Sequence, residues 1–432
     1  MITTAYINLW GNRVGAVAWD TNSQTASFEY EPKFIANNWE VAPLKMPLNQ
    51  ANQIFSFPDL VRNSTFKGLP GLLADVLPDK YGNQLINVWL AQNGRPENSL
   101  NPVELLCFIG TRGMGALEFE PVNFKSNQTA FTIEMDNLVK ISQEVVNNRT
   151  DFETNLNGDE QKALLDILKI GTSAGGARPK AIIAYNEKTG VIKSGQGKAP
   201  KGFNHWLIKL DGVSDSQFGT STGYGRVEMA YYLMAKACKI EMTECRLLEE
   251  NGRAHFMTQR FDREDGDIKY HIQTFCAMQH FDFNNVNSYS YSYEQLFQTM
   301  RLLRLPYPQA EQMFRRMVFN VMARNCDDHT KNFAFRLRKG QNWELTPAYD
   351  MCHAFRPGSE WVSQHALSIN GKRNAITKED LVTVAKLMNI KKATEIIQQT
   401  SEVIKNWTSF AEETKIEAKL KEAIKTTLIT FN

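Results

Sequence analysis

The residues with the clearest chemical meaning lie in the stretch NCDDHTKN, residues 325–332. Asp327 and Asn332 are five residues apart, the spacing of the base and the metal-binding asparagine in the catalytic loop HRDxxxxN of protein kinases. In that chemistry a carboxylate accepts the proton of the substrate hydroxyl, and an amide oxygen one turn later faces the metal that bridges the phosphates. The pattern therefore predicts Asp327 as a catalytic base and Asn332 as a ligand of Mg²⁺.

Asp350, in LTPAYDM, follows Asn332 by eighteen residues. Mg²⁺ prefers hard oxygen ligands, so we interpret Asp350 as the second metal-facing group. Asp and Asn are also the commonest residues of loops and helix N-caps, and the pair at 327 and 332 is weak evidence when taken alone. For His329 we favour a side chain that holds its loop by hydrogen bonds over a metal ligand.

The stretch GTSAGGARPKAII, residues 171–183, combines three glycines with basic residues and runs into a strand predicted over 180–185. It is not a P-loop, because Ala177 occupies the position of the P-loop lysine. Backbone N–H groups of such a loop could still wrap phosphates, with Arg178 or Lys180 adding charge.

Two hydroxyl residues of this loop, Thr172 and Ser173, would lie beside a transferring phosphate and are candidates for autophosphorylation. A phosphate on Ser173 would place about two negative charges where the phosphates of ATP bind. By repulsion it would expel the loop and switch off the enzyme.

Lys209, in the predicted strand 205–210, has the placement of the kinase lysine that binds the α- and β-phosphates, and Glu228 on the helix 225–240 could pair with it. The segment TQRFDR, 258–263, is in the position of the hinge whose backbone meets adenine. The alternative for Lys209 is an edge-strand lysine that prevents aggregation. The alternative for Glu228 is a solvated helix face.

These candidates follow the order of a protein kinase: glycine-rich loop, strand lysine, helix glutamate, hinge, base, amide and carboxylate. Strands are predicted over 3–31, with a turn at Gly11-Asn12, and over 108–121, with a helical pattern between about 51 and 100. A hairpin is predicted at Asn251-Gly252. After residue 263 the pattern is almost wholly helical. In the helix 309–324 the apolar residues repeat every four residues, which is typical of a buried core.

The predicted fold class is therefore α+β, an atypical protein-kinase-like two-lobed fold with a β-rich N-terminal capping subdomain and an all-α C-terminal lobe. The boundaries that we predict are 1–125 for the capping subdomain, 126–260 for the kinase N-lobe, and 261–432 for the helical C-lobe.

Composition limits the classes of partner. The 432 residues are 42% apolar and 22% charged with a net charge of +2, which gives no global signal for nucleic acid or membranes. The six cysteines form no CxxC pair, as expected of reduced thiols in a cytosolic protein. The N-terminus has no secretory pattern and no apolar stretch approaches the roughly 18–20 residues of a membrane span. We expect a cytoplasmic protein.

The quoted motifs together resemble the HipA-type toxins of bacterial type II toxin–antitoxin modules, which are serine/threonine kinases with an atypical kinase fold. YINLWGNRVGAVAW, GLLADVLPDKYGNQLI and ELLCFIGTRGMGALEFEP look like the capping region of that family. GTSAGGARPKA looks like its glycine-rich loop, and QRFDR, NCDDHTKNF and LTPAYDM look like its hinge, catalytic loop and metal aspartate.

The resemblance implies Asp327 as catalytic base, Asn332 and Asp350 as Mg²⁺ ligands, and Ser173 as the inhibitory autophosphorylation site. It implies an ATP site formed by Gly175, Gly176, Ala177, Arg178, Lys180, Lys209, Gln259, Arg260, Phe261, His329, Lys331, Asn332, Tyr349 and Asp350.

The implied partner is a small HipB-like helix-turn-helix antitoxin that binds operator DNA. The implied substrate is a translation component, glutamate–tRNA ligase in the best-known case, whose inactivation would cause growth arrest and persistence. For the basic run at 370–374 we favour a polar turn before the helix that starts near residue 377 over a contact with DNA in such a complex. Two alternatives remain: a small-molecule kinase of similar fold, and a catalytically silent ATP-binding module in a DNA-bound complex.

Overall fold

The structure is a computed structural model that describes residues 2–121, 132–146, 168, 171, 178–215, 219–220, 223–264, 268–284 and 291–431. The chain forms two compact units. Unit 1 consists of Met1–Ala42, Met46–Gly225 and Arg246–Ile272, and unit 2 of Pro43–Lys45, Arg226–Cys245 and Gln273–Asn432.

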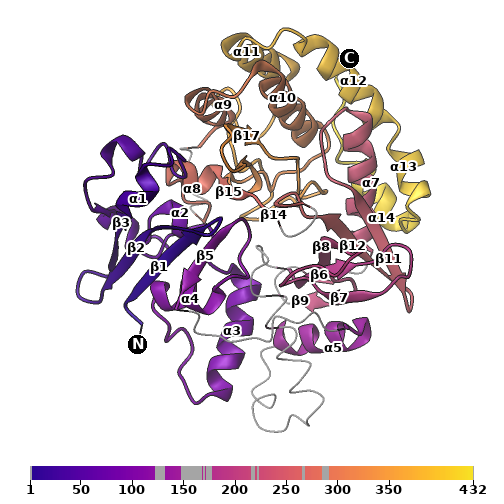
Figure 1. The fold of residues 1–432 in the computed structure, drawn as a ribbon. Helices are drawn as coiled ribbons and strands as arrows, with labels where there is room; N and C mark the ends of the chain where they lie inside the picture. Colours follow the sequence, from indigo (N-terminus) through magenta and orange to yellow (C-terminus); the bar gives the residue numbers. More distant parts are fainter. Residues whose placement is uncertain are drawn as a thin grey trace. The chain divides into compact units, whose positions relative to one another are not determined.

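Unit 1 begins with a five-stranded antiparallel sheet in the order β4-β3-β2-β1-β5. Its strands are β1 (Thr4–Leu9), β2 (Asn12–Asp20), β3 (Thr25–Tyr30), β4 (Phe55–Ser56) and β5 (Leu117–Glu120). Buried residues alternate with more exposed ones along β1, as in a strand with one face in a core. The accompanying helices, labelled in Figure 1, are α1 (Pro32–Ile35), α2 (Gly71–Ala74), α3 (Lys80–Gln92) and α4 (Pro102–Ile109), with 3₁₀ turns at Leu48–Gln50 and Pro58–Leu60.

The turn between β1 and β2 is one residue earlier than predicted. Trp10 and Gly11, with φ of 51° and 75°, are its central residues, and Asn12 already belongs to β2. A two-residue hairpin turn with positive φ at both positions normally takes Asn or Gly. Here the Trp10 indole donates a 2.7 Å hydrogen bond to the Lys269 carbonyl oxygen, and its ring meets Trp39 edge to face. These tertiary contacts stabilise Trp10 in a backbone conformation that a tryptophan in such a turn normally avoids.

The second sheet of unit 1 has the order β11-β12-β8-β6-β7. Its strands are β6 (Lys180–Tyr185), β7 (Ile192–Ser194), β8 (Asn204–Lys209), β11 (Cys245–Glu250) and β12 (Arg253–Gln259). Asn251 and Gly252, with φ of 45° and 79°, form the predicted hairpin turn between β11 and β12. Small two-stranded pairs join β9 (Ser214–Asp215) to β10 (Gly219–Thr220), and β13 (Arg263–Glu264) to β14 (Ile268–Lys269).

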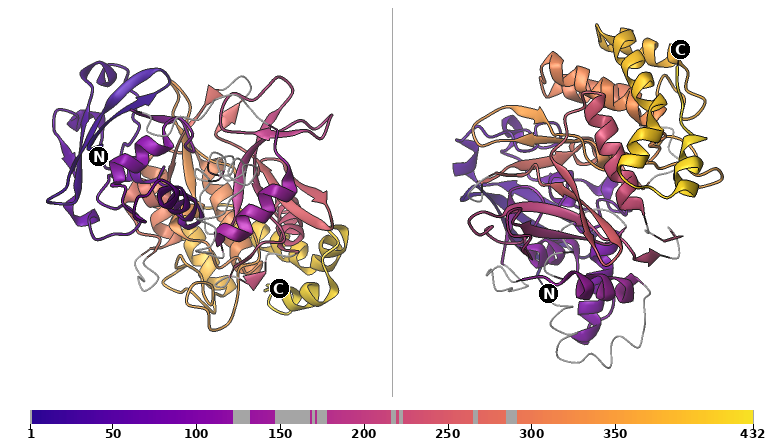
Figure 2. Two further views of the ribbon diagram at one scale, coloured as in Figure 1. Left: turned by 90° about the horizontal axis from the view of Figure 1, so that it is seen from below. Right: turned by 90° about the vertical axis from the view of Figure 1, so that its right-hand side faces the viewer.

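One face of this second sheet packs on α5 (Met135–Val146), as Figures 1 and 2 show. Ala181 and Ile183 of β6 and Trp206 and Ile208 of β8 belong to the same buried cluster as the apolar residues of α5. Because side chains alternate across a strand, the residues between them point to the opposite face.

Unit 2 is mainly helical, as predicted. Its helices are α7 (Tyr224–Ala237, which starts at the end of unit 1), α8 (Phe275–Gln279), α9 (Tyr293–Leu302), α10 (Tyr307–Met322), α11 (Lys378–Met388), α12 (Ala393–Lys405), α13 (Trp407–Glu413) and α14 (Ala418–Lys425). Met313, Met317 and Val321 of α10 are fully buried, which confirms the predicted core stripe. Asn370 and Gly371, with positive φ, form a turn before α11, as favoured for the basic run.

The sequence did not indicate the three-stranded sheet β15-β16-β17 in this part of the chain. Its strands are β15 (His271–Thr274, across the boundary of the units), β16 (Ala334–Leu337) and β17 (Trp343–Leu345). Strands of three or four residues are too short to show a recognisable alternation of polar and apolar residues. The prediction of a C-terminal part without strands was therefore wrong.

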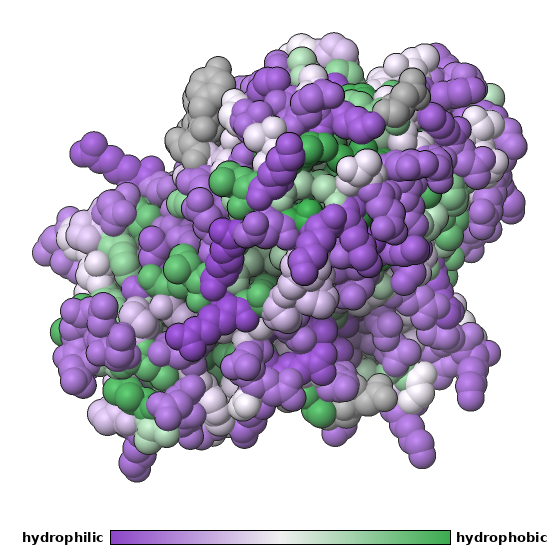
Figure 3. All heavy atoms as spheres, turned by 90° about the horizontal axis from the view of Figure 1, so that it is seen from above, coloured by the Kyte–Doolittle hydropathy of each residue, from purple (hydrophilic) through white to green (hydrophobic). Residues whose placement is uncertain are grey.

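The surface in Figure 3 is largely hydrophilic, with apolar side chains in smaller groups between polar ones. The six cysteines are free, and five of them are buried, as expected of reduced thiols. None of the described helices is long and apolar enough to cross a membrane.

Candidate active site

Two lysines of the second sheet lie directly opposite each other. Lys180 of β6 pairs in register with Lys209 of β8, so both side chains are on the face opposite the α5 core. Lys180 is buried, and the Lys209 ammonium lies 5.9 Å from the centre of the Phe256 ring. The two lysines therefore place their side chains side by side on one face of the sheet. Since β8 is the central strand, the edge-strand alternative for Lys209 is wrong.

The glycine-rich loop is described only at its ends. Thr172, Ser173, Gly175, Gly176 and Ala177 lie outside the described residues. At one end, Gly171 packs closely on α3: a side chain there would come within 2.7 Å of Leu85 Cδ1, which would have to move.

At the other end of the loop, Arg178 lies over the ring of Tyr224, with its guanidinium carbon 4.7 Å from the ring centre. This contact places a cation next to β6, the strand that carries Lys180. Its predicted contact with ATP stays a prediction.

The predicted hinge follows directly from β12. Gln259 ends the strand opposite Trp206, and the Arg260 N–H continues the ladder with a 3.0 Å hydrogen bond to the His205 carbonyl oxygen. The Arg260 side chain does not reach outward: it is 2% exposed, and its guanidinium donates to both carboxylate oxygens of Asp262, at 2.8 and 2.6 Å. A nucleotide could therefore meet this segment through the backbone of Gln259–Phe261, whereas the Arg260 side chain has a structural role.

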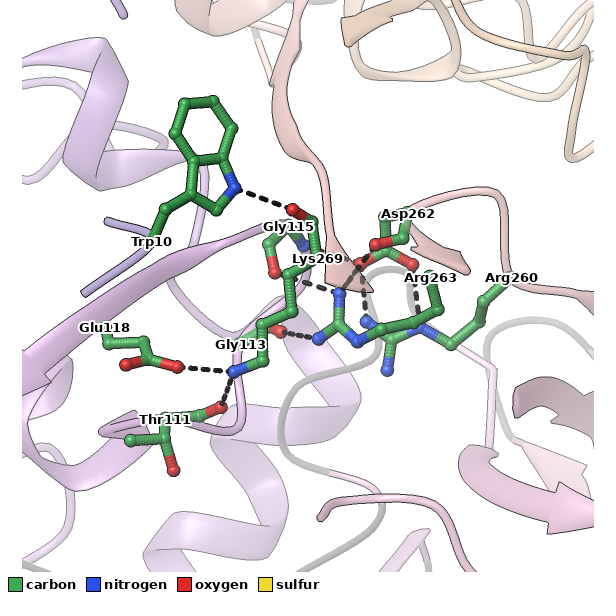
Figure 4. Close-up of polar contacts among 9 residues, drawn as sticks. All are labelled: Trp10, Thr111, Gly113, Gly115, Glu118, Arg260, Asp262, Arg263 and Lys269. Atoms are coloured by element: carbon green, nitrogen blue, oxygen red, sulfur yellow. Dashed lines mark hydrogen bonds and ion pairs between the residues drawn. The ribbon is translucent and has the colours of Figure 1, made fainter. Parts of the chain in front are cut away.

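Asp262 is the centre of a buried polar cluster that sequence analysis missed (Figure 4). Besides Arg260, it accepts hydrogen bonds from Arg263 Nη1 at 2.6 Å and from the Gly115 N–H at 2.7 Å. Burial alone would raise the pKa of the Asp262 carboxyl group, but the two neighbouring guanidinium groups outweigh burial and hold this pKa well below its usual value. Asp262 is therefore ionised and fully paired.

Further bonds in Figure 4 extend the cluster into the segment before β5. Arg263 donates to the carbonyl oxygens of Gly115 and Gly113, at 2.9 and 3.1 Å. Lys269 donates to the Thr111 carbonyl oxygen at 3.0 Å and to Glu118 at 2.6 Å. The segment 111–118 and the hinge are thus fixed to each other within unit 1.

Replacing Asp262 with Asn is expected to loosen this connection. The amide removes the charge that binds two buried guanidinium groups, and a hydrogen bond to a charged group contributes about 1.5–3 kcal/mol. A loss of about 2 kcal/mol corresponds to roughly 30-fold faster local opening. Hydrogen exchange at the Gly115 amide measures it directly. Asp59→Asn, at an exposed site of the same unit, should leave this exchange unchanged, and equal rates in both variants would contradict the role of Asp262.

In unit 2, the predicted catalytic loop follows the buried helix α10. Asn325 is anchored by two hydrogen bonds to Asn320, and the Cys326 N–H donates to the Ala354 carbonyl oxygen at 3.0 Å. Beyond this anchor the Asp327 side chain is 47% exposed. Asn332 Nδ2 donates a 2.7 Å hydrogen bond to the Asp327 carbonyl oxygen, which fixes the amide and leaves Oδ1 as its acceptor end. An accessible carboxylate and an oriented amide therefore share one loop.

His329 differs from expectation. Its Nδ1 has no hydrogen-bond partner among the described residues, and its Nε2 lies 3.9 Å from Asp327 Oδ1, an ion-pair distance. The His329 ring instead packs on the Phe283 ring, with 5.2 Å between their centres. The Lys331 ammonium lies 4.6 Å from the centre of the Phe283 ring. The loop is held here by aromatic packing, and the prediction of side-chain hydrogen bonds was wrong.

Asp350 is tied to the same loop through its neighbour. The Tyr349 hydroxyl donates a 2.6 Å hydrogen bond to the Lys331 carbonyl oxygen. Asp350 itself has a φ of 54°, a left-handed conformation that is uncommon outside glycine and frequent at functional sites. Carboxylate and amide oxygens are the donors that Mg²⁺ prefers, so Asp350 and Asn332 fit the metal that a kinase requires.

Beneath this loop lies a second network that the sequence did not indicate. Asp328 is buried and accepts hydrogen bonds from the Tyr293 hydroxyl at 2.7 Å, from His365 Nδ1 at 2.9 Å and from the Ala366 N–H at 2.8 Å. Burial would lower the pKa of His365, but Asp328 raises it to about 10. His365 is thus a buried cation at neutral pH. The one feature of the sequence that could have indicated this network is Asp328 itself, a second aspartate next to the predicted base Asp327.

Glu228 of α7 is 7% exposed, so the solvated-face alternative for this residue is wrong. Glu228 belongs to unit 2 and Lys209 to unit 1, and the ion pair between them stays a prediction.

Comparison with known proteins identifies the family. A model of the HipA-like C-terminal domain matches residues 172–407, and a model of the HipA N-terminal domain matches residues 5–120. The chain belongs to the HipA family. No curated protein matches this HipA-family chain.

Among solved structures, the chain is similar to HipA of Shewanella oneidensis MR-1 in complex with HipB and its operator DNA, with a TM-score of 0.69 and 18% identity over 98% of this chain and 95% of that one. This match confirms the predicted fold class, with a sheet-rich N-terminal and a helical C-terminal part. The proinflammatory kinase CtkA of Helicobacter pylori also matches, with a TM-score of 0.33 and 11% identity over 54% of this chain and 90% of that one.

Proposed function

We propose that this HipA-family protein is a Mg²⁺- and ATP-dependent serine/threonine protein kinase that acts as the toxin of a toxin–antitoxin pair. One observation carries the proposal: the loop of the exposed Asp327 is bonded to both other groups. The Asn332 amide donates to the Asp327 carbonyl oxygen, and Tyr349, the residue before Asp350, donates to the Lys331 carbonyl oxygen. Base, amide and carboxylate are thereby connected within one unit, as in-line phosphoryl transfer to a hydroxyl requires.

In this proposal each group has one task. Asp327 accepts the proton of the attacking hydroxyl, for which its partial exposure gives access. Asn332 and Asp350 hold Mg²⁺. ATP and Mg²⁺ supply the transferable phosphoryl group and neutralise its charge. Lys180 and Lys209, which lie opposite each other on paired strands, contact the phosphates in this proposal.

The remaining ATP contacts are assigned by family membership. The glycine-rich loop with Gly175, Gly176, Ala177 and Arg178 would wrap the phosphates. The hinge would meet adenine through its backbone, as the burial of the Arg260 side chain favours. His329, Lys331 and Tyr349 would complete the site from the catalytic loop and the strand before Asp350.

Regulation and partners rest on the family. Ser173 would be the autophosphorylation site, and its phosphate would repel ATP. A HipB-like antitoxin and operator DNA are the proposed partners, by analogy with the Shewanella HipA, which was solved with HipB and operator DNA. The proposed substrate is an aminoacyl-tRNA ligase, glutamate–tRNA ligase first, and its phosphorylation would arrest growth.

The test is to incubate the full chain with Mg·ATP, with and without excess EDTA, and to follow phosphate by intact and peptide mass spectrometry. We expect one phosphate, located on Ser173, in the Mg·ATP sample alone. Chelation removes the ion that neutralises the phosphates, so the EDTA sample should stay unmodified. A chain that binds ATP but acquires no phosphate in either sample would favour a silent binding module over a kinase.

A further inference from the structure

The segment that follows Asp350 returns to the catalytic loop within unit 2. The Ala354 N–H donates to the Arg324 carbonyl oxygen at 3.1 Å, and the Ala354 carbonyl oxygen accepts the Cys326 N–H at 3.0 Å. The Arg324 guanidinium carbon also lies 3.6 Å from the centre of the Phe355 ring. The start of this segment is therefore fixed to Cys326, the residue just before the predicted base.

The same segment meets the catalytic loop a second time at Asp328, the residue just after the base. His365 Nδ1 and the Ala366 N–H donate to the Asp328 carboxylate. The residues between the two attachments, 355–364, form a loop that we call the flanking loop. Because its ends are bonded to both chain neighbours of Asp327, the flanking loop begins and ends beside the base.

The flanking loop is closed on itself by hydrogen bonds. The Arg356 N–H donates to the Val362 carbonyl oxygen, and the Ser359 N–H to the Arg356 carbonyl oxygen, both at 3.1 Å. The Ser359 hydroxyl accepts the N–H groups of Trp361 and Val362, both at 3.3 Å. A loop with these internal bonds keeps its side chains in place before a partner arrives, which lowers the cost of binding.

Trp361 is the residue of the flanking loop that the fold itself does not explain. It is 37% exposed, whereas the other seven of the eight tryptophans are buried or half-buried. A large ring in contact with water is unfavourable, and tryptophan on a fixed loop is typical of binding hot spots. The neighbouring side chains of Arg356 and Glu360 are exposed and have opposite charges. The flanking loop therefore offers an apolar contact without a net charge.

We propose that Trp361 is a specificity-determining residue that receives a large apolar side chain of a protein substrate, a few residues from the serine or threonine that is phosphorylated. This inference rests on the proposed kinase function and adds a substrate class to it. An extended chain advances about 3.3 Å per residue, so one polypeptide segment can reach both Asp327 and the flanking loop. A small molecule phosphorylated at Asp327 would leave the Trp361 ring unused.

The test uses a positional-scanning library of short serine peptides, phosphorylated by the full chain with Mg·ATP. One position at a time carries leucine, phenylalanine, glycine, glutamate or lysine. At one fixed position relative to the serine, we expect leucine and phenylalanine to be preferred to glycine by about ten-fold, with glutamate and lysine equivalent to each other. Self-phosphorylation in the same samples, followed by mass spectrometry, reports the kinase reaction separately.

Trp361→Ser should remove this preference through KM. For the best apolar peptide KM should rise about ten-fold while kcat changes by less than about two-fold, and the glycine peptide should be unaffected. Trp361→Phe should retain most of the preference, because it keeps an aromatic ring. Leu302→Ser, which removes an exposed apolar side chain from α9 of the same unit, should retain all of it.

Four outcomes would overturn the inference. Self-phosphorylation together with equal rates for apolar and glycine peptides would exclude docking at Trp361 and leave the kinase function standing. A preference that persists in Trp361→Ser would place the apolar contact elsewhere. If Trp361→Ser slowed self-phosphorylation and every peptide alike, Trp361 would have a structural role only. Absence of phosphate on the chain and on all peptides would refute this inference together with the proposed function.

Discussion

Replacing Asp327 with Asn is expected to slow phosphate transfer from ATP by two to four orders of magnitude, the range that general base catalysis contributes. The amide has the shape of the carboxylate but cannot accept the hydroxyl proton. Asn332 bonds to the backbone oxygen of Asp327 and not to its side chain. The loop should therefore keep its conformation, and ATP affinity should change by less than about three-fold.

The measurement is a single-turnover time course of phosphate on Ser173, with ATP affinity determined separately by calorimetry. Glu395→Gln is the matched control, because it also converts an exposed carboxylate of unit 2 to an amide and lies outside the proposed site. If Asp327→Asn transferred phosphate at the rate of the control, Asp327 would not be the base. If it lost ATP affinity instead, the loop would bind nucleotide through this side chain.

Local patterns predicted much of this fold. The four-residue repeat of α10 marked a buried helix, and Asn251-Gly252 marked a hairpin, because each signal lies within a few residues of the structure it specifies.

Contacts between distant segments could not be predicted in the same way. Asp262 receives the N–H of Gly115, 147 residues away in the sequence, and Asp328 meets His365, 37 residues away. The residues around Asp262 and Asp328 contain no pattern that indicates which distant segment each one contacts. At Trp10 a local signal gave the wrong position for the turn. A hydrogen bond from Trp10 to the Lys269 carbonyl oxygen overrides the local preference for Asn or Gly in this turn. The sequence therefore located residues suited to chemistry, but it missed the buried groups that hold them.

The pair of Asp328 and His365 should be the most costly of these buried contacts to break. Both side chains are about 1% exposed, and removing one partner of a buried ion pair costs about 3–5 kcal/mol, because the other charge remains without compensation. Asp328→Asn should destabilise unit 2 by about that amount. The double variant Asp328→Asn/His365→Gln removes both charges and should recover part of the loss.

The same pair gives a pH dependence whose sign is fixed. His365 has a pKa of about 10 in the folded chain against 6.5 as its ordinary value, so the folded state keeps a proton that the unfolded state releases between these values. The stabilisation is complete below pH 6.5 and is lost as the pH rises toward 10, by about 1.4 kcal/mol per pH unit. Burial would raise the pKa of Asp328, but His365 lowers it, so its contribution is present above pH 3.8 and lost below.

Hydrogen exchange of the α10 amides between pH 6.5 and 9, corrected for the intrinsic exchange rate, measures this loss in unit 2. In the wild type the free energy of opening should fall with each pH unit along this range. The fall should be about 1.4 kcal/mol per pH unit steeper than in the double variant, which lacks the titrating pair. Parallel profiles would mean that His365 is neutral in the folded chain. In that case Asp328 would hold the catalytic loop through hydrogen bonds from Tyr293 and Ala366 without an ion pair.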